Sequence, residues 1–415
     1  MIRTTSRPTP ICSDLPERRR QFCVCQGLTV LIPALRGRFF WGLLLLGATV
    51  PTFAATAPIA TDFADDEILV TLPDLPSPSS NTDISKRSAQ DLADEIQHDI
   101  SQARGQGDPR FLGYAQRLIE AIPDARMTDR LWVLKATWLQ SLHRFDESRV
   151  VLEQVLDNPD TSRRNRIQAL LTLANQETVQ GHYDKAELAA KRLTVVYPGL
   201  IAQSTVALIM ARTGHAESAY RDLNQALTRQ PRVGAVVKAW VEGTLADLAA
   251  QLGLPEAEQH WLATIQLDST DLYSRAAYVD WLVQRQRYAE VEHLTRGYEK
   301  VDPLAVSRAI ALNASGDTGA KAMTDRLDER FSEARWRGNL LHKRDYARYL
   351  LHVAGNPDEA LVWARKNWVT QREPLDTRLL LRAAAAAGDQ QVLKATHQWL
   401  TEHHQRDARY PEVQP

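Results

Sequence analysis

Cysteine is missing from most of this sequence. All three cysteines, Cys12, Cys23 and Cys25, lie within the first 57 residues. The rest of the chain therefore has no structural disulfide, no thiolate metal site and no cysteine nucleophile. We expect it to be stabilised by packing alone.

An excess of charge of one sign is missing as well. The formal net charge of the 415 residues is −1, and the region beyond residue 57 is mildly acidic with both signs mixed. Such a body gives no electrostatic reason to bind nucleic acid or an anionic membrane. Because 44% of the residues are hydrophobic, the chain can nevertheless bury a core.

Long apolar runs are also scarce. An uncharged apolar run at residues 39–50 follows Arg36 and Arg38, and Ala55 and Ala57 then form an Ala-x-Ala pattern. The run is shorter than the ~20 residues that a membrane-spanning helix needs. Basic residues, a short apolar run and small residues in this order are typical of an export signal.

We therefore interpret residues 1–57 as a leader that is removed on export to the periplasm. The alternative is an uncleaved anchor that holds the protein in the inner membrane, facing the periplasm, and we expect no other contact with a membrane. The segment Arg19-Arg20-Gln21-Phe22 resembles a twin-arginine signal, although no Ser or Thr precedes the pair. A lipid anchor is disfavoured, because no cysteine lies at the cleavage region.

Two further segments have the composition of irregular chain. Residues 58–87 contain four prolines and a cluster of Ser, Asn and Thr, which predicts an extended, disordered linker. Within it, the run from Ile68 to Leu72 is expected to be unstructured, with an isolated strand or a docking segment as alternatives. We also expect residues 406–415 to form a disordered tail.

Between these segments the pattern is that of paired helices. Amphipathic stretches with helical periodicity alternate with turns such as those at Gly181, Gly214 and Gly388, and strand signals are nearly absent. The turns predict hairpins whose second helices start near residues 145, 183, 216, 254, 288, 318, 357 and 390. A divergent hairpin within residues 88–130, around Gly105 to Pro109, is expected to cap the amino end.

The repeat pattern is most regular around residues 169–199. This stretch contains Leu170, Leu173 and Ala174, then Gly181 at the turn, and it ends with Pro198. The spacing of large and small residues resembles the tetratricopeptide repeat family, and the resemblance covers residues 131–405. It implies an all-α fold, a right-handed α-solenoid of stacked antiparallel hairpins, in which small residues let paired helices approach closely. A generic α-solenoid is the alternative.

Catalytic motifs are absent from the sequence. We find no phosphate-binding loop, no nucleophile elbow and no zinc-protease motif. We expect no catalytic residues, no metal and no cofactor, and hence no enzyme. The alternative is a hydrolase or lyase acting on envelope polymers, with Glu242 and Asp280 as paired carboxylates in the groove.

The resemblance implies that one residue set lines the concave groove of the superhelix. The candidate binding residues are Asn175, Arg212, Tyr273, His342, Asp345, Tyr349, His352, Arg378 and Arg382. Arg378 and Arg382 are spaced i, i+4 on one helix face, so together they are suited to an acidic peptide or an anionic sugar. Ion pairing between repeats is the alternative role for these two arginines.

These observations lead to a functional hypothesis. We expect a non-catalytic scaffold of the bacterial cell envelope that binds a partner protein or peptide in its concave groove. Assembly of an envelope or export complex is the expected task, and nucleic acid is not an expected partner. This step rests on analogy at the level of the fold.

Overall fold

The computed structural model describes residues 84–338 and 340–411, which belong to the compact unit spanning residues 76–415. The predicted leader, most of the predicted linker and the run from Ile68 to Leu72 lie outside the described residues. In the described part, all regular structure is helical: eighteen α-helices and two short 3₁₀ helices, without a strand. The predicted all-α solenoid, in which each helix packs on its sequence neighbours, is confirmed.

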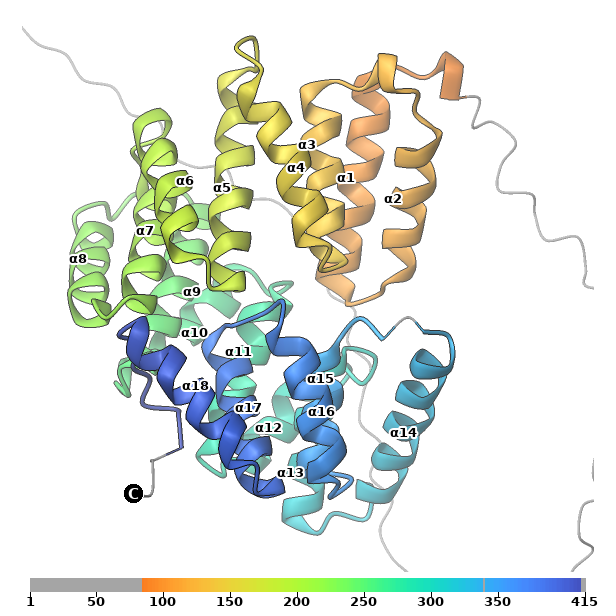
Figure 1. The fold of residues 1–415 in the computed structure, drawn as a ribbon, viewed down its shortest axis with the longest axis vertical. Coiled ribbons are helices and arrows are strands. Elements are labelled where there is room, and N and C mark those ends of the chain that lie inside the picture. The colour runs from red at the N-terminus through yellow and green to blue at the C-terminus, as the bar shows by residue number, and fades with distance from the viewer. Residues whose placement is uncertain (1–83, 339, 412–415) are drawn as a thin grey trace, which may run out of the picture. The chain divides into compact units, whose positions relative to one another are not determined.

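The helices pair as antiparallel hairpins. Their bounds are α1 Ala89–Gln106, α2 Arg110–Ala121, α3 Asp129–Ser141, α4 Phe145–Asp157, α5 Arg163–Gln180, α6 Tyr183–Val196, α7 Leu200–Arg212, α8 Ala216–Thr228, α9 Ala235–Gln251, α10 Glu256–Leu267, α11 Leu272–Gln284, α12 Tyr288–Thr295, α13 Asp302–Ser315, α14 Ala320–Trp336, α15 Lys343–His352, α16 Pro357–Trp368, α17 Pro374–Ala387 and α18 Gln390–Glu402. Figure 1 shows them as successive pairs along the chain.

The predicted hairpin starts agree with these bounds. Six of the eight second helices begin at the predicted residue, and α10 and α14 begin two residues later, at Glu256 and Ala320. The reason at α10 is Pro255, which directly precedes the helix and has a backbone conformation suited to a helix start. The divergent first hairpin, α1 with α2, is also present.

Small side chains bring the paired helices together. Ala136, Ala169, Ala186 and Ala190 are all buried at the contacts between helices, and large aliphatic side chains such as Leu193 fill the space around them. Close-packed contacts of this kind stabilise the solenoid, because each hairpin buries its apolar surface against the neighbouring hairpins.

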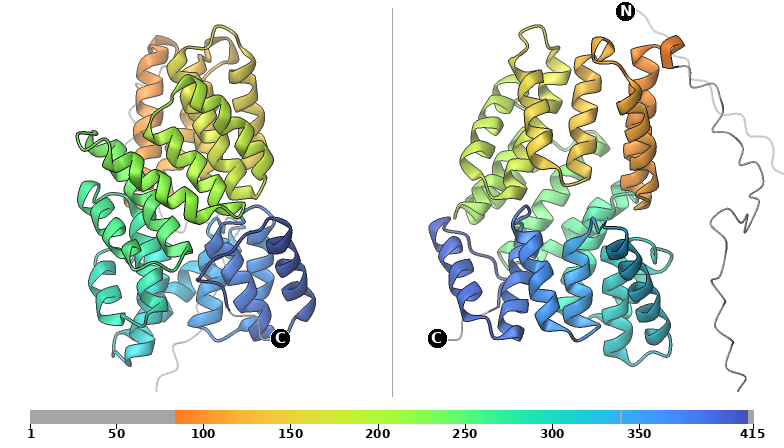
Figure 2. Two further views of the ribbon diagram at one scale, coloured as in Figure 1. Left: turned by 90° about the vertical axis from the view of Figure 1, so that its left-hand side faces the viewer. Right: turned by 45° about the vertical axis from the view of Figure 1, so that its right-hand side comes forward.

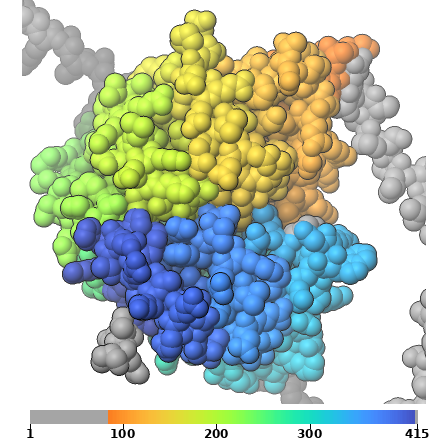
Figure 3. Space-filling view, in the orientation of Figure 1, coloured from red at the N-terminus to blue at the C-terminus, as the bar shows by residue number. Residues whose placement is uncertain are grey.

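The last hairpins return to the first ones. The Arg372 backbone N–H, between α16 and α17, donates to the Val179 carbonyl on α5 at 2.7 Å. The Gln371 side chain contacts the His143 ring, in the turn between α3 and α4, with 3.1 Å between Nε2 and Nδ1. Figures 1 and 2 show α15 to α18 beneath α3 to α7, and Figure 3 shows the two sets of side chains meeting along a continuous boundary.

This return corrects two expectations. The predicted concave groove is partly interior, since four of its nine predicted residues, Arg212, Asp345, Tyr349 and Arg378, are buried. Residues 406–411, predicted to be a disordered tail, pack against α9, and Asp407 and Arg409 are buried there.

The right-handed sense of the superhelix stays a prediction. Over the described residues, none of the helices has both the length and the apolarity that crossing a membrane requires.

Candidate anion-binding cleft

A cleft of about 220 Å³ lies where α11, α15 and α17 meet. Its charged and titratable residues are Asp280 from α11, Arg348 and His352 from α15, and Arg378 and Arg382 from α17. On α15 and on α17 the two residues are spaced i, i+4, so each helix turns one face toward the cleft. The hairpin arrangement thus brings residues together that lie about a hundred positions apart in sequence.

Asp280 is the acidic centre of this arrangement. Arg378 Nη2 donates to its Oδ1 and Oδ2 at 2.8 and 2.7 Å, and Arg348 Nη2 lies 3.0 Å from its Oδ1. Gln284 Nε2 adds a bond of 2.9 Å to Oδ2. Burial opposes ionisation of this carboxyl, but the two arginines outweigh it and hold the pKa of Asp280 well below its usual range.

Positive charge exceeds negative charge in the cleft. Three guanidinium groups line it, and Asp280 is the one carboxylate among the lining residues that the structure describes. Arg348 also approaches Asp345, at 3.7 Å, so even with this second acid the cluster carries an excess of one positive charge.

Two of the guanidinium groups keep unused donors. Arg378 is buried, and its Nη1 atom has no hydrogen-bond partner. Arg382 is half-buried, and within the described chain its side chain makes no hydrogen bond and no ion pair. Burial and the nearby Arg378 lower the pKa of Arg382, which reflects the cost of holding like charges together. Donors left unpaired in this setting favour an incoming anion.

His352 lies at the exposed edge of the cleft. The crowding around its ring and repulsion by Arg348 and Arg382 lower its pKa to about 4. The imidazole is therefore neutral at pH 7, and it offers one donor and one acceptor to a ligand.

The other walls of the cleft are partly apolar. Val283, Ile310, Leu379 and Tyr288 line it together with Gln284 and Gln286. An anionic head on a short aliphatic stem matches such walls, because the head meets the guanidinium groups and the stem meets the apolar side chains.

The structure brings together three of the nine predicted groove residues, namely His352, Arg378 and Arg382. Two of the others are core residues: Asp345 is buried, and the Tyr349 ring packs 5.5 Å from the Phe331 ring. For these two, the expectation of a place on an open groove is corrected, because α15 turns Arg348 and His352 toward the cleft.

The remaining four lie elsewhere in the fold. Arg212 is buried and paired with Asp247. His342 Nδ1 lies 2.8 Å from Asp302, and Tyr273 donates to Glu373 at 3.2 Å. Asn175 is half-buried on α5.

Arg348 is the cleft residue that the sequence analysis missed. The signal was available, because Arg348 lies one helical turn before His352 and points to the same side. The repeat pattern placed Asp345 and Tyr349 on that side together with His352, and of these three only His352 lines the cleft.

The predicted pair of catalytic carboxylates is engaged in two separate networks. Glu242 Oε2 lies 2.7 Å from His260 Nδ1, and the Tyr220 hydroxyl lies 3.1 Å from the other ring nitrogen. Asp280 is held ionised by its arginines, so it has no proton to give as a general acid. Across the described residues, no group of three or more His, Cys, Asp or Glu side chains is arranged to hold a metal ion.

Comparison of the sequence with models of protein families and with curated proteins finds no match.

Proposed function

We propose that this chain is a non-catalytic binding protein of tetratricopeptide type, and that the cleft between α11, α15 and α17 takes a carboxylate group of an acidic protein segment. The observation that carries the proposal is the buried Arg378 Nη1 without a partner, beside Arg382, whose side chain makes no hydrogen bond and no ion pair within the described residues. A ligand carboxylate supplies the acceptors that both groups lack.

The energetic reason is the high cost of burying a charged donor that stays unpaired. A hydrogen bond to a charged group contributes about 1.5–3 kcal/mol, and an Arg–carboxylate pair is among the strongest of these. Asp280 already engages Arg378 and Arg348 on one side. A second carboxylate in the cleft would give Arg378 a further acceptor and balance the charge of Arg382.

A protein segment fits the cleft better than an anionic polysaccharide does. The volume of about 220 Å³ suits a side chain or a chain terminus, whereas a row of sugar rings needs a longer trough. The apolar walls also favour the aliphatic stem of Glu over a hydroxylated ring.

Location and biological role belong to the same proposal. The leader pattern supports export to the periplasm, and the solenoid supports a scaffold that assembles an envelope or export complex. Mass spectrometry of the mature amino terminus tests export: a terminus near residues 54–57 supports a periplasmic protein, and an intact leader supports the inner-membrane alternative.

The binding proposal is tested with Arg382→Gln. This substitution removes one positive charge from the cleft and breaks no ion pair, whereas Arg378→Ala would also strip Asp280 of a partner. We expect the full chain to bind a tetraglutamate peptide in calorimetric titration, more weakly as salt increases. Arg382→Gln should weaken binding by about tenfold, since ~1.4 kcal/mol corresponds to a factor of ten.

Arg365→Gln is the matched control. Arg365 lies on the neighbouring helix α16 with its side chain exposed, so the same charge is removed outside the cleft. Equal affinity of Arg382→Gln and the unmodified chain would contradict the proposal. Binding of a trigalacturonate but not of tetraglutamate would replace the peptide by an anionic sugar.

A further inference from the structure

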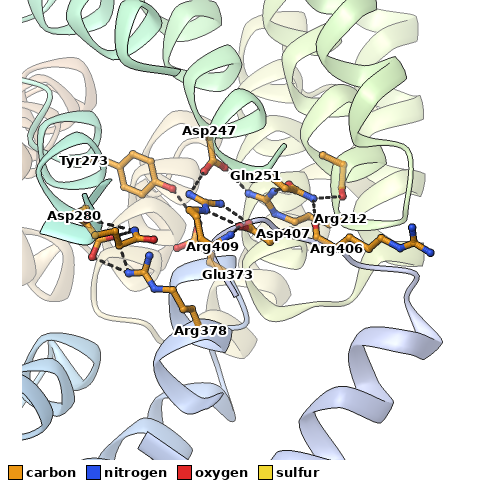
Figure 4. A network of polar contacts seen from close by, with 12 residues as sticks. Arg212, Asp247, Gln251, Tyr273, Asp280, Glu373, Arg378, Arg406, Asp407 and Arg409 are labelled. Carbon is orange, nitrogen blue, oxygen red and sulfur yellow. Dashed lines mark hydrogen bonds and ion pairs between the residues drawn. The ribbon is translucent and has the colours of Figure 1, made fainter. Parts of the chain in front are cut away.

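Residues 403–411, which we call the strap, follow α18 and run across the turns that join α7 to α8 and α9 to α10. Figure 4 shows Arg406, Asp407 and Arg409 of the strap beside Asp247 and Gln251 of α9. The strap lies apart from the cleft residues in sequence, and the function proposed above makes no use of it.

Gln251 holds the main chain of the strap. Its Nε2 atom donates to the Arg406 carbonyl at 2.8 Å, and its backbone carbonyl accepts from the Ala408 N–H at 2.8 Å. That carbonyl lies in the last turn of α9, where no intrahelical donor is left. The same Nε2 also donates to the Ala211 carbonyl at 2.7 Å, which fixes the orientation of the amide. Main-chain contacts of this type supply affinity for an extended segment.

Arg409 and Asp407 supply the sequence-specific contacts. Arg409 Nη1 lies 3.3 Å from Asp247 Oδ1, while its Nε and Nη2 donate to Asp407 at 2.8 and 2.6 Å. Both side chains of the strap are buried. Asp247 is paired with Arg212 through its other oxygen, so it forms a preorganised acceptor for one more guanidinium.

Two hairpin turns are shaped to let the strap pass. Gly214 has φ +90°, and a Cβ at this position would lie 2.9 Å from the Cβ of His404 and 3.2 Å from its carbonyl oxygen. At Gly253 a Cβ would lie 3.0 Å from the Cβ of Ala408. Any side chain at either turn would therefore push the strap away, so each turn provides room for one strap residue.

We propose that Arg212, Gly214, Asp247, Gln251 and Gly253 form a binding site for an extended segment with the pattern Asp-x-Arg. The strap occupies this site within its own chain. The corresponding segment of a second copy binds it when the internal strap is disabled. Because the internal strap is tethered, it competes at a high effective concentration and keeps the site closed to other segments.

The test uses the full chain with Arg409→Ala. This change releases the anchor of the strap, while Asp247 keeps its pair with Arg212. We expect fluorescence anisotropy to show binding of a labelled peptide of residues 403–411 to this variant. The unmodified chain should bind the same peptide at least tenfold more weakly, because its own strap is in place. A peptide that itself carries Arg409→Ala should bind this variant with at least tenfold lower affinity.

Equal binding of the two peptides, or no binding to a folded Arg409→Ala chain, would overturn the proposal. Circular dichroism establishes that the variant is folded. If it is not, trypsin cleavage after Arg406 in the unmodified chain decides, since this side chain is exposed while the main chain beside it is held. Cleavage at least tenfold slower than in the free peptide supports the site, and cleavage at the rate of the free peptide overturns it.

Discussion

At the scale of single residues, the cleft depends on a carboxylate that is shared between two arginines. Asp280 is buried and accepts from both Arg378 and Arg348. Removing one member of a buried ion pair leaves its partners charged and uncompensated, which costs more than the pair itself contributes.

We therefore predict that Asp280→Asn lowers the free energy of unfolding by about 3 kcal/mol, the lower end of the range for broken buried pairs. Urea unfolding followed by circular dichroism measures this change. Asp325→Asn is the control, since Asp325 forms an exposed pair with Lys321 and should contribute less than about 1 kcal/mol. Equal effects of the two substitutions would show that the Asp280 cluster is not a buried network.

At the scale of helices and hairpins, small residues decide how closely two helices pack. Ala186 on α6 is fully buried where α6 packs on α5, and the structure leaves no room there for a larger side chain. On the same helix, Leu188 is 62% exposed. The two positions therefore differ in packing although they are only two residues apart, because a helix turns them to opposite sides.

We predict that Ala186→Leu destabilises the protein by about 1–3 kcal/mol, because overpacking forces helices apart or side chains off their rotamers. The midpoint of urea unfolding should fall accordingly. Leu188→Ala, which removes volume from the exposed face, is expected to stay within about 0.5 kcal/mol of the unmodified protein. An unchanged midpoint for Ala186→Leu would mean that the contact between α5 and α6 is looser than described.

The hairpins are the part of the structure that the sequence predicts well. Glycine turns such as Gly181 and the periodic apolar residues on either side are local signals, so they place the start of α6 at the observed residue. Which face a helix turns inward depends on contacts with residues distant in sequence, so local signals predict it less well. On α15 the repeat pattern predicted Asp345, Tyr349 and His352 on the inner face, whereas in the structure Arg348 and His352 line the cleft.

At the scale of the whole molecule, the return of the later hairpins onto the earlier ones could not be predicted from the repeats. Closure depends on small angles between successive hairpins, and these add up over the whole solenoid. The contacts of Arg372 with Val179 and of Arg409 with Asp247 join residues far apart in sequence, and no local pattern indicates them. For this reason the prediction of a disordered tail was wrong for residues 406–411.

One closure contact contains a histidine that titrates. His143, in the turn between α3 and α4, accepts from Gln371. Burial, together with repulsion by His342, Arg344 and Lys343, lowers the pKa of His143 to about 3. The unfolded chain binds this proton near pH 6.5, but the folded chain does not, so the contribution of neutral His143 is present above pH 6.5 and is lost as pH falls toward 3.

We predict that closure weakens in acid and that His143→Asn reduces this dependence. Each such histidine lowers the free energy of unfolding by up to about 1.4 kcal/mol per pH unit below its unfolded pKa. Asn is a suitable replacement, because residue 143 has φ +58° and Asn tolerates this conformation. Urea unfolding at pH 7 and pH 5 measures the slope. His293→Asn, at an exposed position on α12, is the control, and the same pH slope in both variants would contradict the prediction.

The strap also gives folding an order in time. Residues 403–411 are synthesised after every hairpin that they contact. The earlier hairpins can therefore stack before the strap packs over Gly214 and Gly253. A nascent chain stalled before this segment would present Asp247 and Gln251 uncovered to the surrounding solution. Synthesis of residues 403–411 is thus the step that covers Asp247 and Gln251.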